Sequence, residues 1–487
     1  MNNINTLDLA NKIEGKLYGP NIELSGNFTY LNKAAENDIV IRHWINEKGI
    51  QIARDRGVSC IITQNPQDNS VEYAQKVSFP LIVTQHIEYA TAYALNKSIN
   101  DYAKDAFKVS VTGTNGKSTT SHLLFTIFSD LNYNTYTNTD AESEGNTLID
   151  PRVSVELSEF YSNHDSIDVI SLEVSEVQGW DDKLMKDHSY QMISALEADV
   201  AIITNASFDH MNLVESFDEL LYEIAGAARA LNNQNKKTLL VLNYDDENIR
   251  KMKKEVDDNP NVELMYFGEY DEEKTLDISY KENVGIYSNG ELYIEYDDLP
   301  FTSAHFIQDI MAAIAVCEYK SLNRNQVVSS LKNYKPLSRR FIKLHENPTI
   351  IDDFAHNPSG IKLTIENGLK LGNRLIVVNA IRGSRGEDIN GEIAEALAQT
   401  LSQIEDYTLI LTCSKDVVNH LNTVLPSELE VFTKTLKNRH IEYMLLENLE
   451  DSLKKSLELS SKEDVILLLG AQGMDPASHI LSKNNII

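Results

Sequence analysis

The stretch KVSVTGTNGKSTT, residues 108–120, decides the fold class of this chain. Its first half is apolar and β-branched, which predicts a buried strand, and Lys117 with Ser118 opens a predicted helix. Residues 113–116 between them form a tight loop, which aims backbone N–H groups and the positive end of the helix at one point. Phosphates bind at such points. Lys117 would neutralise phosphate oxygens, and the Ser118 hydroxyl would ligate Mg²⁺.

The loop is a shortened variant of the common phosphate-binding pattern. That pattern has a glycine five residues before the second one, and here Val111 stands at that position, so the loop has the form G-x-x-G-K-S. A generic kinase or GTPase match is therefore poor, and a plain glycine-rich turn between strand and helix is the alternative.

Composition sets limits on the class of protein. The 487 residues leave room for about three domains, and the net charge of −29 argues against a nucleic-acid partner. Cys60, Cys317 and Cys413 stand apart without metal-ligand spacing, which fits a reducing compartment. The first residues lack the features of a signal peptide, and no apolar run is long enough to span a bilayer. We expect a cytoplasmic monomer without membrane insertion.

Alternating β-rich and helical segments predict an α/β fold in three domains. A small N-terminal α/β domain is expected at 1–105, a central parallel-sheet domain of the P-loop ATPase kind at 106–337, and a Rossmann-like α/β domain at 338–487. The predicted strands are Val58–Thr63, Pro80–Thr84, Val109–Thr112, Val169–Leu172, Val200–Thr204, Leu239–Leu242, Thr349–Ile351, Leu375–Val378, Leu409–Thr412 and Val465–Leu469.

Polar residues follow the predicted central strands directly. Ligands of parallel sheets bind at the carboxyl ends of the strands, so these residues are expected near the phosphate loop. Glu173 is a candidate magnesium ligand, and Asn205 ends the next strand. His210, directly after Asp209, is a candidate metal or phosphate ligand.

The third region has its own candidates. Asp352, Asp353 and His356 end a predicted strand, and nucleotide or substrate positioning is the role expected of them. Arg339, beside Arg340, offers the bidentate fork that suits a γ-phosphate, and an ordinary surface arginine pair is the alternative.

Seven motifs occur in one order: TGTNGKST, LEVS, ITNASFDHM, LNYDDEN, AHFIQDIMAAIAV, SRR and IDDFAHNP. Together they resemble the Mur ligase family of ATP-dependent amide-bond-forming enzymes, over nearly all of residues 105–487. The first hundred residues are loosely similar to the substrate-binding domain of murein peptide ligases. The resemblance implies a three-domain fold with a C-terminal amino-acid-binding domain. It also implies a mechanism in which ATP converts a carboxylate into an acyl phosphate that an amine attacks.

The resemblance also implies roles for particular residues. Nucleotide binding falls to Gly113, Thr114, Asn115, Gly116, Lys117, Ser118, Thr119, Asp309, Arg339 and Asp353. Magnesium binding falls to Ser118, Glu173 and His210. The catalytic residues implied are Lys117, His210 and Arg339.

The chain departs from the family pattern at the second metal. The family has a lysine some fourteen residues after its Asp-His histidine, carbamylated to hold this metal, and Ile224 takes that place here. We hypothesise that Glu223, or Glu219, supplies the missing carboxylate directly.

Other departures concern the substrates. The family's adenine-seating His-Asn-x-x-Asn element is here His305 to Asp309, in which Asp309 could accept from an adenine amine and Phe306 could pack on the base. The tetrapeptide Asp-Asn-Pro-Arg that reads diaminopimelate is absent, so that amine is not expected. Asn146-Thr147 loosely resembles substrate-contacting threonines or is a turn cap, and Gly470–Pro476 is either part of the amine site or a simple turn.

We therefore expect an ATP- and Mg²⁺-dependent ligase that joins an amino acid to a carboxylate-bearing precursor. A nucleotide-linked cell-wall peptide, of murein or pseudomurein, is the expected precursor. The alternatives are a polyglutamate or cyanophycin-like ligase, a ligase acting on a tetrapyrrole side chain, and a nucleotide-binding pseudoenzyme.

Overall fold

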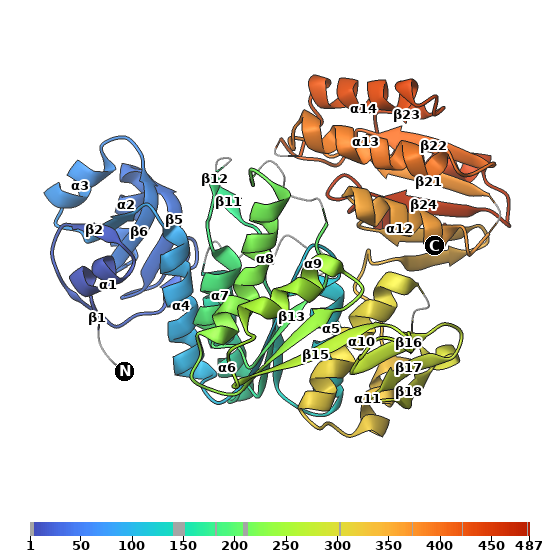
Figure 1. Cartoon of the computed structure of the whole chain (residues 1–487). Coiled ribbons are helices and arrows are strands. Elements are labelled where there is room, and N and C mark those ends of the chain that lie inside the picture. Colours follow the sequence, from blue (N-terminus) through green and yellow to red (C-terminus); the bar gives the residue numbers. More distant parts are fainter. Residues whose placement is uncertain are drawn as a thin grey trace. The chain divides into compact units, whose positions relative to one another are not determined.

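The computed structural model describes residues 4–139, 151–180, 183–207, 213–300, 303–372, 374–420, 422–484 and 486–487. It is a mixed α/β protein with three large, mostly parallel sheets flanked by helices (Figure 1). The chain divides into two compact units, residues 1–206 with 216–334 and residues 207–215 with 335–487. The predicted α/β class is confirmed, and the phosphate loop follows a strand of the central parallel sheet.

A five-stranded sheet forms the N-terminal part of the first unit. Its order is β2-β7-β6-β5-β4, and only the edge strand β2 is antiparallel. The strands are β2 Gly15–Tyr18, β4 Phe28–Thr29, β5 Ile39–Ile45, β6 Cys60–Pro66 and β7 Leu81–Thr84. The helices are α1 Thr6–Lys12, α2 Glu47–Asp55, α3 Ser70–Lys76 and α4 Ile87–Tyr102. A separate antiparallel pair joins β1 Ile4–Asn5 to β3 Glu23–Leu24.

Helix α4 connects the five-stranded sheet to the rest of the first unit. Its residues Ile87 and Ala90 lie in the apolar core of that sheet, and Met185, from far along the chain, lies in the same core. The helix also packs on α6, Arg152–His164, and on α7, His188–Leu196. One helix therefore contributes to two packed layers.

A nine-stranded sheet forms the centre of the first unit, in the order β18-β17-β16-β15-β14-β13-β8-β10-β9. The strands from β9 to β16 are parallel, and β17 and β18 extend one edge as antiparallel strands. The strands are β8 Phe107–Thr112, β9 Thr135–Thr137, β10 Val169–Glu173, β13 Val200–Ile203, β14 Thr238–Asn243, β15 Val262–Glu269, β16 Ile278–Lys281, β17 Gly285–Ser288 and β18 Glu291–Glu295.

The helices around this sheet complete the first unit. Besides α6 and α7 they are α5 Lys117–Asp130, α8 Phe217–Asn232, α9 Glu247–Arg250, α10 Ala304–Tyr319 and α11 Arg324–Lys332, with 3₁₀ turns at Lys251–Glu255 and Tyr296–Asp298. A short antiparallel pair joins β11 Gly179–Trp180 to β12 Lys183–Leu184. The central strands predicted from the sequence correspond to β8, β10, β13 and β14.

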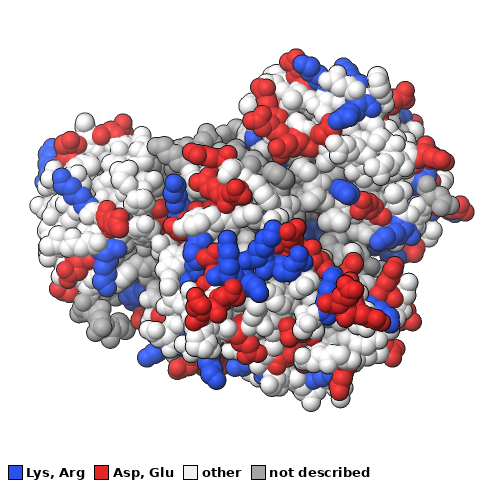
Figure 2. Space-filling model, in the orientation of Figure 1, with Lys and Arg blue, Asp and Glu red and all other residues white. Residues whose placement is uncertain are grey.

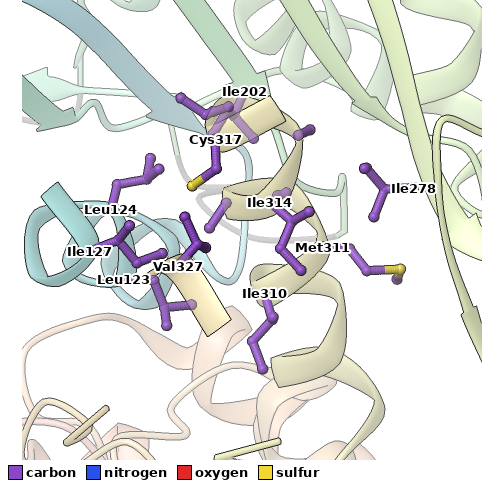
Figure 3. Packing of buried hydrophobic residues seen from close by; sticks show 14 of the residues in the cluster. Leu123, Leu124, Ile127, Ile202, Ile278, Ile310, Met311, Ile314, Cys317 and Val327 are labelled. Atoms are coloured by element: carbon purple, nitrogen blue, oxygen red, sulfur yellow. The ribbon is translucent and has the colours of Figure 1, made fainter. Parts of the chain in front are cut away.

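Helix α5 is held in place by α10, which packs beside it in the core of the nine-stranded sheet (Figure 3). Every residue of α10 from Ile310 to Cys317 is buried, as expected of a helix that is apolar all round. Leu123 and Ile127 of α5 point into the same cluster (Figure 3). Because α5 begins at the phosphate loop, this packing fixes the position of the loop as well.

The second unit contains a six-stranded sheet in the order β19-β20-β24-β21-β22-β23, and only the edge strand β19 is antiparallel. The strands are β19 Ile342–Glu346, β20 Thr349–Asp353, β21 Leu375–Ala380, β22 Tyr407–Thr412, β23 Met444–Leu446 and β24 Val465–Leu469. The helices are α12 Pro358–Gly368, α13 Glu387–Leu401, α14 Pro426–Asn438, α15 Leu449–Leu459 and α16 Ala477–Lys483. Val377 and Val378 lie in different core clusters, so both faces of this sheet are covered.

Surface and cysteine features are simple. Lys and Arg side chains lie among Asp and Glu side chains over the face seen in Figure 2. Across the described ranges, no helix has the length and apolar character needed to cross a membrane. Cys60, Cys317 and Cys413 are buried and not in disulfides.

A buried carboxylate joins helices α7 and α8. Glu223 of α8 is 1% exposed, and its Oε1 accepts a hydrogen bond of 3.0 Å from the backbone N–H of Asp187, at the start of α7. Its Oε2 has no hydrogen-bond partner among the described residues. Burial raises the pKa of Glu223 to about 7, although the backbone N–H of Asp187 favours the ionised form.

We expect the Glu223→Gln variant to change how stability depends on pH. The unfolded chain releases this proton near pH 4.5 and the folded chain near pH 7, so wild-type stability falls as the pH rises through this window. A glutamine removes that loss. The variant should therefore gain roughly 1–3 kcal/mol relative to wild type between pH 5 and pH 8, measured by denaturant unfolding.

The matched control is Glu291→Gln, because the Glu291 side chain is 85% exposed. This control should show no pH-dependent difference from wild type. Equal pH profiles for wild type and Glu223→Gln would contradict the raised pKa.

Candidate functional site

The phosphate loop between β8 and α5 has a shape that requires its two glycines. Gly113 has φ of 115° and Gly116 has φ of 86°, a region that side chains disfavour. A Cβ on Gly113 would overlap the Thr204 hydroxyl, and a Cβ on Gly116 would overlap the carboxylate of Asp309. The loop therefore brings backbone close to its neighbours, as a phosphate cradle must.

The loop is anchored to the segment that follows β13. The Asn115 carbonyl accepts hydrogen bonds from Thr204 Oγ1 at 2.6 Å and from Asn205 Nδ2 at 2.9 Å. The backbone N–H of Asn115 donates to Asn205 Oδ1 at 3.0 Å, and that of Thr114 donates to the Asn205 carbonyl at 2.9 Å. Asn205, noted in the sequence for its place at a strand end, thus shapes the loop. Thr119, one turn into the site helix, is buried.

Lys117 is held by a residue that sequence reasoning missed. Its Nζ donates to the carbonyls of Gly113 at 2.7 Å and Thr114 at 2.9 Å, and to Glu176 Oε2 at 2.8 Å. Glu176 is 0% exposed and lies three positions after Glu173. The available signal was a charged residue in the otherwise apolar stretch around Val174 and Val177, directly after a strand end.

Ser118 and Glu173 come together beside the loop. Strand β10 pairs with β8 in register, so that Glu173 lies opposite Val111, one strand away from the loop. The Ser118 hydroxyl donates to Glu173 Oε1 at 3.0 Å, and both side chains are buried. A hydroxyl and a carboxylate are oxygen ligands of the kind that Mg²⁺ prefers, so the pair fits this ion.

The remaining predicted metal ligands do not complete a cluster in the described part of the chain. Within those residues, no group of three or more His, Cys, Asp or Glu side chains could hold a metal. Asp209 and His210 lie outside the described residues, as do Asn146 and Thr147. Glu223 contacts the start of α7, and its assignment to a second metal stays a prediction.

Asp309 of α10 lies at the phosphate loop. Its Oδ1 accepts a hydrogen bond of 3.3 Å from the Thr120 hydroxyl, and it is 4% exposed. Its carboxylate also faces Gly116, where a Cβ would displace it. The sequence suggested a role for Asp309 at the adenine, and the structure brings this residue to the loop glycine.

Arg339 is enclosed within the second unit. Its Nε donates to Asp352 at 3.3 Å, and its Nη1 donates to the Ala471 carbonyl at 3.1 Å. Asp475 and the Gly470 carbonyl are further acceptors of the same guanidinium. The residue is 6% exposed, so the group ties the ends of strands β20 and β24 together. The Gly470–Pro476 segment thus has a structural partner.

Arg340, the next residue, is only half-buried. Its guanidinium lies 4.9 Å from the ring centre of Phe354, and its charge favours the ionised form of Asp353. Burial nevertheless raises the pKa of Asp353. The carboxylate accepts backbone hydrogen bonds from Phe341 at 2.7 Å and Ala355 at 2.8 Å. Nucleotide-binding roles for Arg339 and Asp353 stay predictions.

His356 and Asp352 complete this part of the second unit. The Nδ1 of His356 lies 2.8 Å from the Phe354 carbonyl. Burial raises the pKa of Asp352 to about 6, while the Arg339 guanidinium favours the ionised form. Asp352 therefore serves as the counter-charge of a buried arginine.

Three comparisons with known proteins bear on the fold. UDP-N-acetylmuramate–L-alanine ligase of Ligilactobacillus salivarius (strain UCC118) is 25% identical over 282 residues, which are 57% of this chain and 54% of that protein. The match thus spans about half the length of this relative. MurF ligase from Thermotoga maritima in complex with ADP superposes with a TM-score of 0.66 at 16% identity, covering 95% of this chain and 97% of that one. A pseudomurein peptide ligase type C from Methanothermus fervidus gives 0.56 at 19% identity, covering 92% and 94%.

Family assignments cover most of the chain. Residues 111–317, which include the phosphate loop, Glu173 and Asp309, match the Mur ligase middle domain. Residues 339–472, which include Asp353, match the glutamate ligase domain of Mur ligases. With its loop glycines, strand order and both domains in the order of the family, this chain belongs to the Mur ligases.

Proposed function

We propose that this protein is an ATP- and Mg²⁺-dependent ligase that forms an amide bond between a carboxylate and an amine. The observation that carries the proposal is the convergence of Lys117, Ser118 and Glu173 on one glycine loop, within a Mur ligase middle domain. A neighbour of the same fold is in complex with ADP, which supports a nucleotide at this loop.

The proposed reaction has two steps. A carboxylate oxygen of the first substrate attacks the γ-phosphorus of ATP, ADP leaves, and an acyl phosphate forms. The amine then attacks the acyl carbon, phosphate leaves, and the amine loses a proton. Magnesium bound between Ser118, Glu173 and the phosphates would neutralise charge that develops on the phosphate oxygens.

The protein's own groups perform distinct tasks in the first step. The backbone N–H groups at the start of α5 point at the phosphates, and the helix dipole favours their charge. Lys117 supplies a positive charge beside them. Catalysis of phosphoryl transfer rests chiefly on such positioning and electrostatic stabilisation.

We further propose a nucleotide-linked cell-wall peptide as the carboxylate substrate and an amino acid as the amine. The relative from Ligilactobacillus salivarius is a ligase of UDP-N-acetylmuramate and L-alanine, and the neighbour from Methanothermus fervidus is a pseudomurein peptide ligase. Both murein and pseudomurein precursors are therefore within the proposal. We propose that the protein works as a cytoplasmic monomer, and its three thiols outside disulfides fit a reducing compartment.

Phosphate release from ATP tests the proposed function. It should require a nucleotide-linked peptide and an amino acid together, stop in EDTA, and return with excess Mg²⁺. The Lys117→Met variant should lower kcat by roughly 100-fold or more, because one preorganised charge is lost. Phosphate release that continues without either substrate, or in EDTA, would contradict the proposal.

The Gly116→Ala variant should lose nucleotide affinity. Alanine at a φ of 86° costs about 1–2 kcal/mol, and its Cβ meets the Asp309 carboxylate, so the loop must move. We expect the Kd for ADP in Mg²⁺ to rise at least about tenfold by calorimetry. Gly290→Ala is the control, because a Cβ at Gly290 has open space around it at a similar φ of 81°. Equal losses in both variants would show that backbone strain alone is responsible.

Alanine variants of the two adjacent arginines should separate structural from chemical roles. Arg339→Ala leaves Asp352 buried without its guanidinium and should lower the free energy of unfolding by about 3–5 kcal/mol. Arg340→Ala should lower kcat with little change in unfolding, because this side chain is not enclosed. The opposite pattern in denaturant unfolding and steady-state rates would reverse the two assignments.

A further inference from the structure

The ammonium of Lys117 has no hydrogen-bond donor left for a phosphate. A lysine ammonium carries three N–H donors and no acceptor. All three have acceptors within 2.9 Å, two of them carbonyls of the loop itself and the third the Glu176 carboxylate. A phosphate oxygen must therefore replace one of these acceptors before Lys117 can bind it.

Glu176 is the acceptor that costs most to leave alone. It is 0% exposed, and its carboxylate takes the ammonium at 2.8 Å as an ion pair. A buried carboxylate that loses its cation is strongly destabilised, because neither water nor another charge replaces it. Moving Lys117 from Glu176 to a phosphate is thus favourable only if another positive charge arrives at the same time.

The charges beside the loop point the same way. Two carboxylates, Glu173 and Glu176, face the single ammonium of Lys117 at the loop. Glu173 lies 3.0 Å from the Ser118 hydroxyl, on the strand immediately before Glu176. A bare polyphosphate entering here would meet two like charges at short range in a buried site. A polyphosphate that carries a divalent cation would meet a compensated one.

We propose that Glu176 is a positioning residue that holds Lys117 in the nucleotide-free enzyme and makes nucleotide binding depend on a divalent cation. The inference rests on the proposed nucleotide site and adds a condition to it. The cation offsets the carboxylate charge, after which the ammonium can be shared with the phosphates. In the absence of a cation, the Lys117–Glu176 pair stays closed and keeps bare anions out.

Calorimetric titration with ADP, with Mg²⁺ or with EDTA, tests this proposal on the full chain. Wild type should bind ADP at least about tenfold more weakly in EDTA than in Mg²⁺. Glu176→Gln keeps the size and an acceptor oxygen for Lys117 but removes the charge. Its Kd for ADP in EDTA should fall about tenfold, while its Kd in Mg²⁺ should change less than about threefold.

The control is Glu272→Gln, which removes one charge from an exposed position of the same unit and should leave both affinities unchanged. A purely structural role for Glu176 would weaken ADP binding in both solutions together, and that outcome overturns the proposal. Cation-independent ADP binding by wild type also overturns it and needs no variant, so a poorly folded Glu176→Gln leaves the question answerable. If wild type binds no ADP even in Mg²⁺, the proposed function fails as well.

Discussion

The parallel pairing of β8 with β10 and β13 is the constraint on which the candidate site depends. Its register sets Glu173 opposite Val111 and Ile203 opposite Thr112, so that all three strands end at one edge. The loop after β8, the carboxylates after β10 and the anchoring Asn205 after β13 meet only because of this alignment. A slip of one residue would turn each side chain to the other face of the sheet.

The strands of this sheet could be predicted because burial on both faces selects continuous apolar runs. The short edge strand Thr135–Thr137 and the antiparallel extension after Ile278 were not predicted, because half-exposed strands carry mixed residues. The loop glycines, Ser118 and Glu173 stand in local motifs. Glu176 has no motif, since its importance comes from a partner 59 residues away in the chain.

Buried charges show the same limit of sequence reasoning more sharply. Arg339 and Arg340 are adjacent and chemically identical, yet the first is enclosed by carboxylates and carbonyls and the second is only half-buried. Glu223 attracted attention because it stands beside the position of the family's lysine, and its described hydrogen bond caps a helix. A residue type and its position can indicate that a charge matters. They do not reveal whether that charge serves the fold or the chemistry, because that depends on distant neighbours.

Helix α4 has a consequence for the evolution of the N-terminal region. Its Ile87 and Ala90 complete the core of the five-stranded sheet, to which Met185 also contributes, while the helix packs on α6 and α7. A cut near residue 105 would leave an apolar surface on each fragment, so this region cannot be exchanged between relatives as a free module. New substrate preferences would then have to arise by substitution within a shared core, at a pace limited by what that core tolerates.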